Sequence, residues 1–297
     1  MAAACSYEIY LPSIGYGSRI LARDIRLTLL PGECILLAGA NGCGKTTLLK
    51  AIEAGNRGAI RKQLPLRDVS TPGHGQGEGP VGDKLFTRSR DDKFTCRIQD
   101  EGRTQETMGG AGRAKRGSSR RGTAAGAERF SVLYLPTGIP KVKGFTVREF
   151  IRTGCYKDSA WKREDGHSTA CTWNLESRIR DALETLGISE LGDRDLSTLS
   201  DGQFQKAILA IALSRRADLL LIDEPTAFLD VPGRRAVLQT LRTLTRERGL
   251  SVIFSSHDIV DALDVADRVI GITPSHSFLS SGPDDREAVL DRLFEWR

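Results

Sequence analysis

The feature that most constrains the fold is a glycine-rich stretch between two patterned segments. Residues 39–46, Gly-Ala-Asn-Gly-Cys-Gly-Lys-Thr, fit G-x-x-x-x-G-K-[ST] without a gap. The apolar run 34–38 before it is typical of a buried strand, and residues 46–53 after it are typical of a helix. This order predicts an anion-binding loop, because backbone N–H groups and the positive end of the helix then point at one spot. A glycine turn with a purely structural use is the alternative.

The residue types in this stretch suit the phosphates of a nucleotide. Glycines let the backbone turn its N–H groups inward, and Lys45 would reach the β- and γ-phosphates. The Thr46 hydroxyl is a hard oxygen ligand for Mg²⁺. Cys43 is expected to be a small filler of the loop, not a redox sensor. The expected nucleotide-binding residues here are Gly39, Asn41, Gly42, Cys43, Gly44, Lys45, Thr46 and Thr47.

Composition places the chain among ordinary globular proteins. It has 297 residues, 39% hydrophobic and 27% charged, and a net charge of +5, which does not point to a nucleic-acid-binding arm. No stretch approaches the ~18 consecutive apolar residues of a membrane span, and the first residues do not resemble a secretory signal. The six cysteines form no C-x-x-C pair, which favours reduced thiols over a disulfide framework or a zinc site.

Strand-like and helix-like segments alternate along the chain, which predicts an α/β fold with a mostly parallel sheet. The predicted strands are 6–12, 19–30, 34–38, 131–135, 219–223 and 251–255, the first two of them near an edge. The predicted helices are 46–53, 146–154, 174–187, 203–215, 232–248 and 258–266.

Residues 69–128 have a different composition. Gly, Arg, Ser and Thr dominate, apolar periodicity is absent, and residues 110–122 carry five basic residues and no acidic one. Such a segment buries too little apolar surface to offset its chain entropy, which predicts a flexible insertion. The basic residues could touch anionic lipid headgroups or RNA, or the segment could be a solvated loop without a partner.

Two carboxylates follow a second apolar run, residues 219–222. Ligands of parallel sheets bind at the carboxyl ends of the strands. Asp223 is therefore expected to hold Mg²⁺, through a water, and Glu224 to polarise the water that attacks the γ-phosphorus. A solvated acidic pair at a strand end is the alternative.

A third motif, Leu199-Ser200-Asp201-Gly202-Gln203, resembles the LSGGQ signature of ATP-binding cassette (ABC) ATPases. Other motifs of that family stand in the family's order. Residues 228–230, Phe-Leu-Asp, resemble the D-loop, and His257 resembles the switch histidine. Tyr16 stands where the family's adenine-stacking aromatic usually is. The resemblance covers about residues 6–285, apart from the insertion.

The resemblance implies a P-loop NTPase fold of the ABC ATPase type, with a mostly parallel core sheet, an antiparallel β subdomain and a helical subdomain. Residues 1–297 would be a single nucleotide-binding domain, with residues 138–200 as the helical subdomain. ATP and Mg²⁺ are the implied cofactors, and ATP hydrolysis coupled to transmembrane transport is the implied activity.

The resemblance also implies a homodimer in which two copies pair head to tail, so that the signature of one closes the ATP site of the other. Ser200 would donate its hydroxyl and Gly202 its backbone N–H to the γ-phosphate, at a helix N-terminus that favours an anion. His257 would be catalytic and would bridge the γ-phosphate and the partner's D-loop. Gln203 and Asp230 complete the implied nucleotide-binding residues.

The chain departs from the family pattern at three positions. Asp201 replaces the first signature glycine and adds negative charge near a polyanion, which should weaken closure unless a cation neutralises it. Lys206 stands where the family usually has Arg. Thr137 stands where the glutamine after strand 131–135 is expected, and its oxygen could join the Mg²⁺ shell through a water or a local shift. The other motif residues are intact, so ATPase activity is still expected.

A single cassette without a membrane span implies separate integral membrane permease subunits, and a place on the cytoplasmic face of the inner membrane. Residues 144–154 resemble the segment "TVxExVxxGR" of the iron-chelate (siderophore, haem, cobalamin) importer ATPases, and Trp161 continues the likeness. Residues 137–165 would receive a short helix of the permease. A substrate-binding protein would be an indirect partner, and nucleic acid is not expected.

Two alternative functions stay open. The same mechanism could serve another cargo, zinc or an exported substrate. The departures at Asp201 and Thr137 favour, as the second alternative, a regulatory subunit that binds ATP and hydrolyses it weakly.

Overall fold

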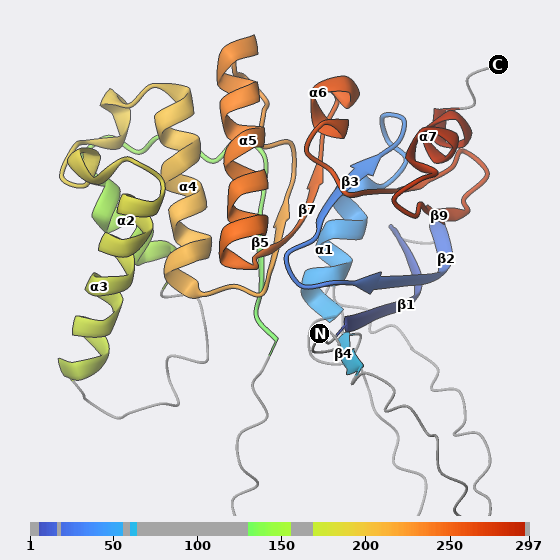
Figure 1. Ribbon diagram of the computed structural model, residues 1–297, viewed down its shortest axis with the longest axis horizontal. Helices are drawn as coiled ribbons and strands as arrows, with labels where there is room; N and C mark the ends of the chain where they lie inside the picture. Colours follow the sequence, from blue (N-terminus) through green and yellow to red (C-terminus); the bar gives the residue numbers. More distant parts are fainter. Residues whose placement is uncertain (1–5, 17–18, 56–59, 64–129, 156–168, 295–297) are drawn as a thin grey trace, which may run out of the picture. The chain divides into compact units, whose positions relative to one another are not determined.

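The computed structural model describes residues 6–16, 19–55, 60–63, 130–155 and 169–294. By their contacts these residues fall within one compact unit. They form a six-stranded sheet, a three-stranded sheet and the helices that flank them (Figure 1). The insertion expected over residues 69–128 lies outside the described residues, and so does the part of the expected permease surface that contains Trp161.

The larger sheet has the strand order β5-β6-β7-β3-β8-β9. The first five strands in this order run parallel, and β9 is antiparallel to β8, so the predicted mostly parallel sheet is confirmed. The strands are β3 (Cys34–Ala38), β5 (Val132–Leu135), β6 (Leu219–Ile222), β7 (Ser251–Ser255), β8 (Arg268–Ile272) and β9 (Phe278–Ser280). The last two were not predicted from the sequence.

The smaller sheet is antiparallel, with β1 (Ser6–Tyr16) between β2 (Arg19–Leu29) and β4 (Ile60–Gln63). Strand β1 is the middle strand, next to the edge strand β2, because β4, which the sequence did not reveal, pairs with its second side. Together with the larger sheet, this arrangement confirms the α/β fold class with an antiparallel β part.

The helices follow the predicted segments closely along most of the chain. They are α1 (Lys45–Gly55), α2 (Val147–Cys155), α3 (Thr169–Thr185), α4 (Asp201–Arg215), α5 (Val231–Arg248), α6 (Ile259–Leu263) and α7 (Arg286–Phe294). Two 3₁₀ turns, Ser189–Leu191 and Leu196–Thr198, come between α3 and α4. Helix α6 is shorter than predicted, and α7 was not predicted. No helix in the described part of the chain combines the length and the apolar character of a membrane span.

Both faces of the larger sheet are buried. All five residues of β3 are 0% exposed. Cys34, Leu36 and Ala38 belong to the apolar cluster that includes residues of α2 to α7. Ile35 and Leu37 belong to a second cluster, with residues of α1, β1 and β2. Side chains alternate between the faces of a strand, so a continuous apolar run fits a strand covered on both sides.

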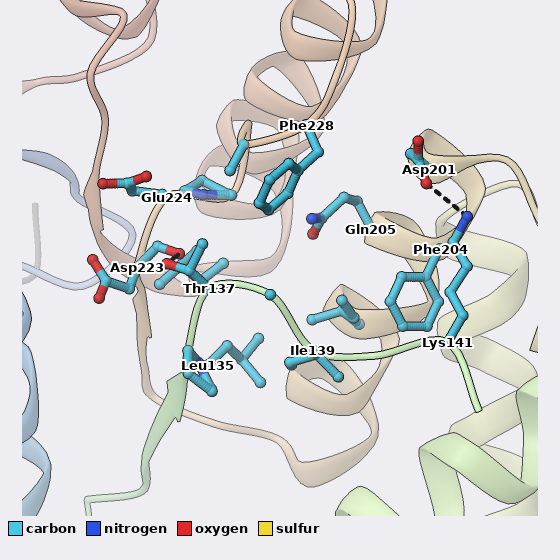
Figure 2. A pocket seen from close by; sticks show the side chains of 16 residues that line it. Leu135, Thr137, Ile139, Lys141, Asp201, Phe204, Gln205, Asp223, Glu224 and Phe228 are labelled. Carbon is cyan, nitrogen blue, oxygen red and sulfur yellow. Dashed lines mark hydrogen bonds and ion pairs between the residues drawn. The ribbon is translucent and has the colours of Figure 1, made fainter.

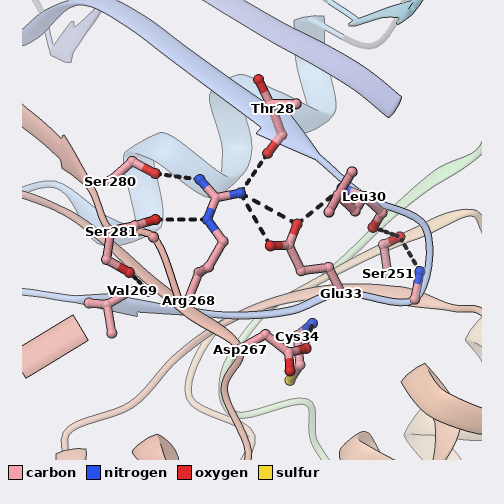
Figure 3. A network of polar contacts seen from close by, with 12 residues as sticks. Thr28, Leu30, Glu33, Cys34, Ser251, Asp267, Arg268, Val269, Ser280 and Ser281 are labelled. Carbon is pink, nitrogen blue, oxygen red and sulfur yellow. Dashed lines mark hydrogen bonds and ion pairs between the residues drawn. The ribbon is translucent and has the colours of Figure 1, made fainter. Parts of the chain in front are cut away.

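Polar side chains tie together the amino ends of the strands. The Arg268 guanidinium donates from Nε to Ser281 O at 2.8 Å, and from Nη1 to Thr28 O at 2.8 Å and Glu33 Oε1 at 3.2 Å (Figure 3). The Glu33 carboxylate also accepts from the Leu30 backbone N–H at 3.0 Å. The side chain of Arg268 is 16% exposed and that of Glu33 is 6% exposed. This largely buried pair joins β2, β3 and β8 at the end opposite the glycine-rich loop.

Two further contacts strengthen the same end of the sheet. The Ser251 hydroxyl, at the start of β7, donates to Leu30 O and accepts from Gly32 N, both at 3.2 Å. The Asp267 carboxylate accepts from Cys34 N at 2.9 Å. Burial, and then the charge of Asp267, raises the pKa of the Cys34 thiol to about 12, so this thiol stays protonated and unreactive.

Replacing Arg268 with Met should lower the free energy of unfolding by about 3 kcal/mol, because a buried Glu33 carboxylate would lose its cation. Urea unfolding measures the effect. As a control, Arg26→Met breaks the exposed pair with Asp24, whose side chains are 65% and 66% exposed, and should leave the midpoint unchanged. Equal shifts in both variants would show that the Arg268 network adds no particular stability.

Candidate functional site

The glycine-rich loop curls between the end of β3 at Ala38 and the start of α1 at Lys45. Gly39, Gly42 and Gly44 have φ values of 140°, 77° and 110°. These conformations are open to glycine and strained for other residues, which explains the spacing of the motif. A glycine-rich loop that ends at a helix N-terminus is a common anion-binding arrangement.

The loop fits phosphate groups. Lys45 is 8% exposed, and its ammonium donates to Gly39 O at 2.9 Å and Ala40 O at 3.3 Å, so a cation lies inside the loop. A Cβ built on Gly42 would meet no atom within 4 Å, so space is open there. The Thr47 hydroxyl is buried and has no hydrogen-bond partner among the described residues. An anionic ligand would fill the open space, pair with the cation and give the unpartnered hydroxyl an acceptor.

Asn41 and Cys43 form the turn of the loop. Asn41 is exposed, and the Cys43 backbone N–H donates to Ala40 O at 3.3 Å. A Cβ built on Gly39 would come within 2.9 Å of the Cys43 sulfur. The thiol therefore occupies the space beside Gly39, as a filler of the loop would.

Asp223 follows β6 and joins the loop to the sheet. Its Oδ2 accepts from Thr46 Oγ1 at 2.5 Å and its Oδ1 accepts from Ser255 Oγ at 2.7 Å, and the residue is 7% exposed. Burial, followed by the charge of Asp223, raises the pKa of the neighbouring Tyr134. A hydroxyl and a carboxylate in contact are the hard oxygen donors that Mg²⁺ prefers, so this pair fits the expected metal.

Glu224 and His257 form the second reactive pair. Glu224 Oε1 lies 2.5 Å from His257 Nε2, with side chains 27% and 53% exposed, respectively. Glu224 has φ 51°, a left-handed conformation that is strained for this residue, and its backbone N–H donates to Ser255 Oγ at 2.9 Å. The pair is open to solvent on one side and fixed to β7 on the other.

Ser255 also belongs to the candidate site, although no sequence motif singles it out. Its hydroxyl is 0% exposed, donates to the Asp223 carboxylate and accepts from the Glu224 backbone. The sequence carried one signal, a small hydroxyl residue at the carboxyl end of an otherwise apolar strand, two positions before His257. The pairing of β6 with β7 brings this hydroxyl beside Asp223, and the sequence alone does not show that these two strands are neighbours.

Thr137 lies beside Asp223 but turns its hydroxyl to the backbone. Its Oγ1 donates to Asp223 O at 2.8 Å. Both residues, with Glu224, line a cavity of about 370 Å³ between the segment after β5, α4 and the turn before α5 (Figure 2). The expected contribution of Thr137 to a Mg²⁺ shell stays a prediction.

The signature residues begin α4, on the far side of this cavity. Ser200 caps the helix: its Oγ accepts from Gln203 N at 3.2 Å, and Gln203 Oε1 accepts from Ser200 N at 3.1 Å. A Cβ built on Gly202 would meet no atom within 4 Å, so this end of the helix is open. Figure 2 shows Asp201 across the cavity from Glu224. Within one chain, the signature does not join the acidic pair.

Two other residues expected to bind the nucleotide, Asp230 and Tyr16, lie outside the glycine-rich loop. Asp230 caps α5 and accepts from a backbone N–H of its first turn at 2.9 Å. Arg234 of the same helix pairs with Asp258 at 2.5 Å, which ties α5 to the segment after β7. Tyr16 ends β1 and is 60% exposed, and no hydrogen bond or ring contact within the described residues attaches it to the loop.

Comparisons with known proteins agree with these motifs. The family model described as "ABC transporter" matches residues 22–71 and 103–227, more than half of the chain. The achromobactin transport ATP-binding protein CbrD of Dickeya dadantii is 26% identical over 296 residues, covering 99% of this chain and 88% of that protein. The ferric enterobactin transport ATP-binding protein FepC of Escherichia coli is 25% identical over 291 residues, covering 95% and 83%.

A solved structure shows the same fold. The ADP conformation of an ATP-binding cassette of an ABC transporter aligns with a TM-score of 0.60 at 16% identity, covering 97% of this chain and 94% of that one. The chain belongs to the ABC transporter family, as one of its ATP-binding domains, which are ATPases coupled to transport.

Proposed function

We propose that this chain is the ATP-hydrolysing, energy-coupling subunit of an ABC importer for an iron chelate of the siderophore, haem or cobalamin type. The observation that carries the hydrolytic part is the Glu224–His257 pair, 2.5 Å apart, beside the hydrogen-bonded Thr46 and Asp223. The cargo class rests on the relatives, one of which is named for transport of ferric enterobactin.

The loop would hold the triphosphate. Lys45 would exchange its bonds to the loop carbonyls for bonds to the β- and γ-phosphates, and the Thr47 hydroxyl would gain a partner. Thr46 and Asp223 would hold Mg²⁺, which neutralises phosphate charge when it is bound. Tyr16, which is 60% exposed, has a ring accessible enough to stack on the adenine.

Glu224 would accept a proton from the attacking water. His257 contacts one oxygen of its carboxylate, so the second oxygen can face the water. The bond from the Glu224 backbone to Ser255 holds the strained conformation that directs this side chain. The residues therefore hold the base in place before the substrate arrives, which is the arrangement that lowers a reaction barrier.

The signature would serve the site of a second copy. Ser200 and Gly202 lie at an open helix N-terminus, and Figure 2 shows the same helix end across the cavity from the acidic pair. A head-to-tail, two-fold homodimer brings this end to the partner's γ-phosphate, and Asp230 to the interface. ATP binding would close the dimer and hydrolysis would reopen it, which drives separate permease subunits at the cytoplasmic face of the inner membrane.

Glu224→Gln should reduce ATP hydrolysis at least about a hundredfold while ATP still binds, because the amide keeps the shape and cannot accept the proton. Phosphate release and binding of a fluorescent ATP analogue, in the assembled complex, measure the two effects. The control is Glu247→Gln, an exposed change on α5 that should leave both unchanged. Equal hydrolysis by the wild type and Glu224→Gln would reject the enzymatic proposal and favour the regulatory subunit.

Ser255→Ala should raise the Mg²⁺ concentration for half-maximal hydrolysis about tenfold, because Asp223 loses a donor that fixes its carboxylate. The matched control is Ser251→Ala, in the same strand. It also removes a hydroxyl with one donated and one accepted hydrogen bond, at the end far from the site. A Mg²⁺ titration of both variants, with thermal melting to compare stability, measures this. The same Mg²⁺ response in both would contradict a role for Ser255 at the metal.

The cargo is tested by uptake in proteoliposomes that contain the chain with its permease subunits and binding protein. Labelled ferric siderophore, haem or cobalamin should accumulate with ATP in the wild-type complex and not with Glu224→Gln. Zinc uptake without uptake of any chelate would replace the cargo class and leave the ATPase proposal standing.

A further inference from the structure

We propose that Lys141 is a positioning residue for the signature: it neutralises Asp201 and fixes the peptide before Ser200, so that the N-terminus of α4 can receive a phosphate group. The inference rests on the proposed function, in which this helix end meets the γ-phosphate bound by a second copy. It assigns a role to a residue outside the nucleotide-binding motifs.

Asp201 creates an electrostatic problem at this helix end. It is the first residue of α4, and its side chain is 60% exposed. A carboxylate suits the positive end of a helix when nothing binds there. The same charge repels a phosphate that must approach Ser200 and Gly202, and it offsets the helix dipole that would attract the phosphate.

Lys141 forms an ion pair with the Asp201 carboxylate. Its Nζ lies 2.6 Å from Asp201 Oδ1 and also 5.8 Å from the centre of the Phe204 ring. It is the one cation paired with Asp201 among the described residues. The Lys141 side chain is 26% exposed, so the pair is less screened than a fully solvated one. The carboxylate and ammonium together add no net charge to the helix end.

Lys141 also fixes the backbone at the cap. Its Nζ donates to Leu199 O at 2.8 Å, while the N–H of the same peptide unit, on Ser200, donates to Gln203 Oε1 at 3.1 Å. Both polar atoms of the Leu199–Ser200 peptide are therefore held. The lysine thus helps to hold the backbone of Ser200, whose hydroxyl accepts from the Gln203 backbone N–H at 3.2 Å.

The lysine stands on the segment that leaves β5. Thr137, four residues earlier, donates to the carbonyl of Asp223, and Lys141 contacts Asp201 at the α4 end of the same cavity (Figure 2). One short segment thus contacts both the acidic strand end and the signature.

The test compares four variants in the assembled complex: Lys141→Met, Lys141→Arg, Asp201→Gly and the double variant Lys141→Met/Asp201→Gly. Lys141→Met should raise the KM for ATP about fivefold, with a smaller change in kcat, because an unpaired Asp201 opposes closure around ATP. The effect should shrink in high salt. Lys141→Arg keeps the charge and should retain most of the wild-type KM. The double variant should lose the part of the KM increase that comes from the unpaired Asp201, while the part that comes from the missing bond to Leu199 O should remain.

The matched control is Lys143→Met, an exposed lysine two residues away that should leave the KM unchanged. Thermal melting separates a folding defect from the expected change in KM. A Lys141→Met enzyme with the wild-type KM would overturn the inference. A Lys141→Met defect that the added Asp201→Gly change does not reduce at all would also overturn it, since the lysine would then not act by neutralising Asp201. If the wild type hydrolyses no ATP, or hydrolyses it independently of Glu224, the proposed function fails. If hydrolysis depends on Glu224 and only the Lys141 results differ from those expected, the role of Lys141 alone fails.

Discussion

The carboxylate of Asp223 is shared by two hydroxyl groups, and the rest of the candidate site is arranged around it. At 7% exposure this anion needs partners, and it receives them from Thr46 on α1 and Ser255 on β7. The strand order β6-β7-β3 brings these three ends side by side. A slip of one residue in the register of β7 would turn the Ser255 hydroxyl to the other face of the sheet. The geometry of the site thus depends on the apolar packing that sets the register.

Much of the site could be predicted because its signals are local. The loop from Gly39 to Thr46 needs particular backbone angles at fixed spacing, and the sequence records that need directly. The apolar run before Asp223 marks a buried strand, and the rule that ligands bind at the carboxyl ends of parallel strands places its acids near the loop. The contact between Thr46 and Asp223, 177 residues apart, agrees with that reasoning.

Other features could not be predicted, because they depend on which distant segments become neighbours. The β9 strand has three residues and β4 has four, too few to show a period, and β4 gives β1 its central position. The pairing of Lys141 with Asp201 spans 60 residues and uses a long side chain from a segment without periodicity. The sequence showed the charge that needed a partner, but only the structure identifies the lysine that supplies it.

The six-stranded sheet has two chemically different ends. Arg268, Glu33 and Ser251 lie at the amino ends of the strands, where they hold neighbouring segments together. The groups proposed to handle the nucleotide gather at the carboxyl ends. Enzymes commonly lose activity when they are made more rigid near their chemistry. In this protein, stabilising changes in the amino-end network would lie at the opposite end of the sheet from the groups proposed to handle the nucleotide.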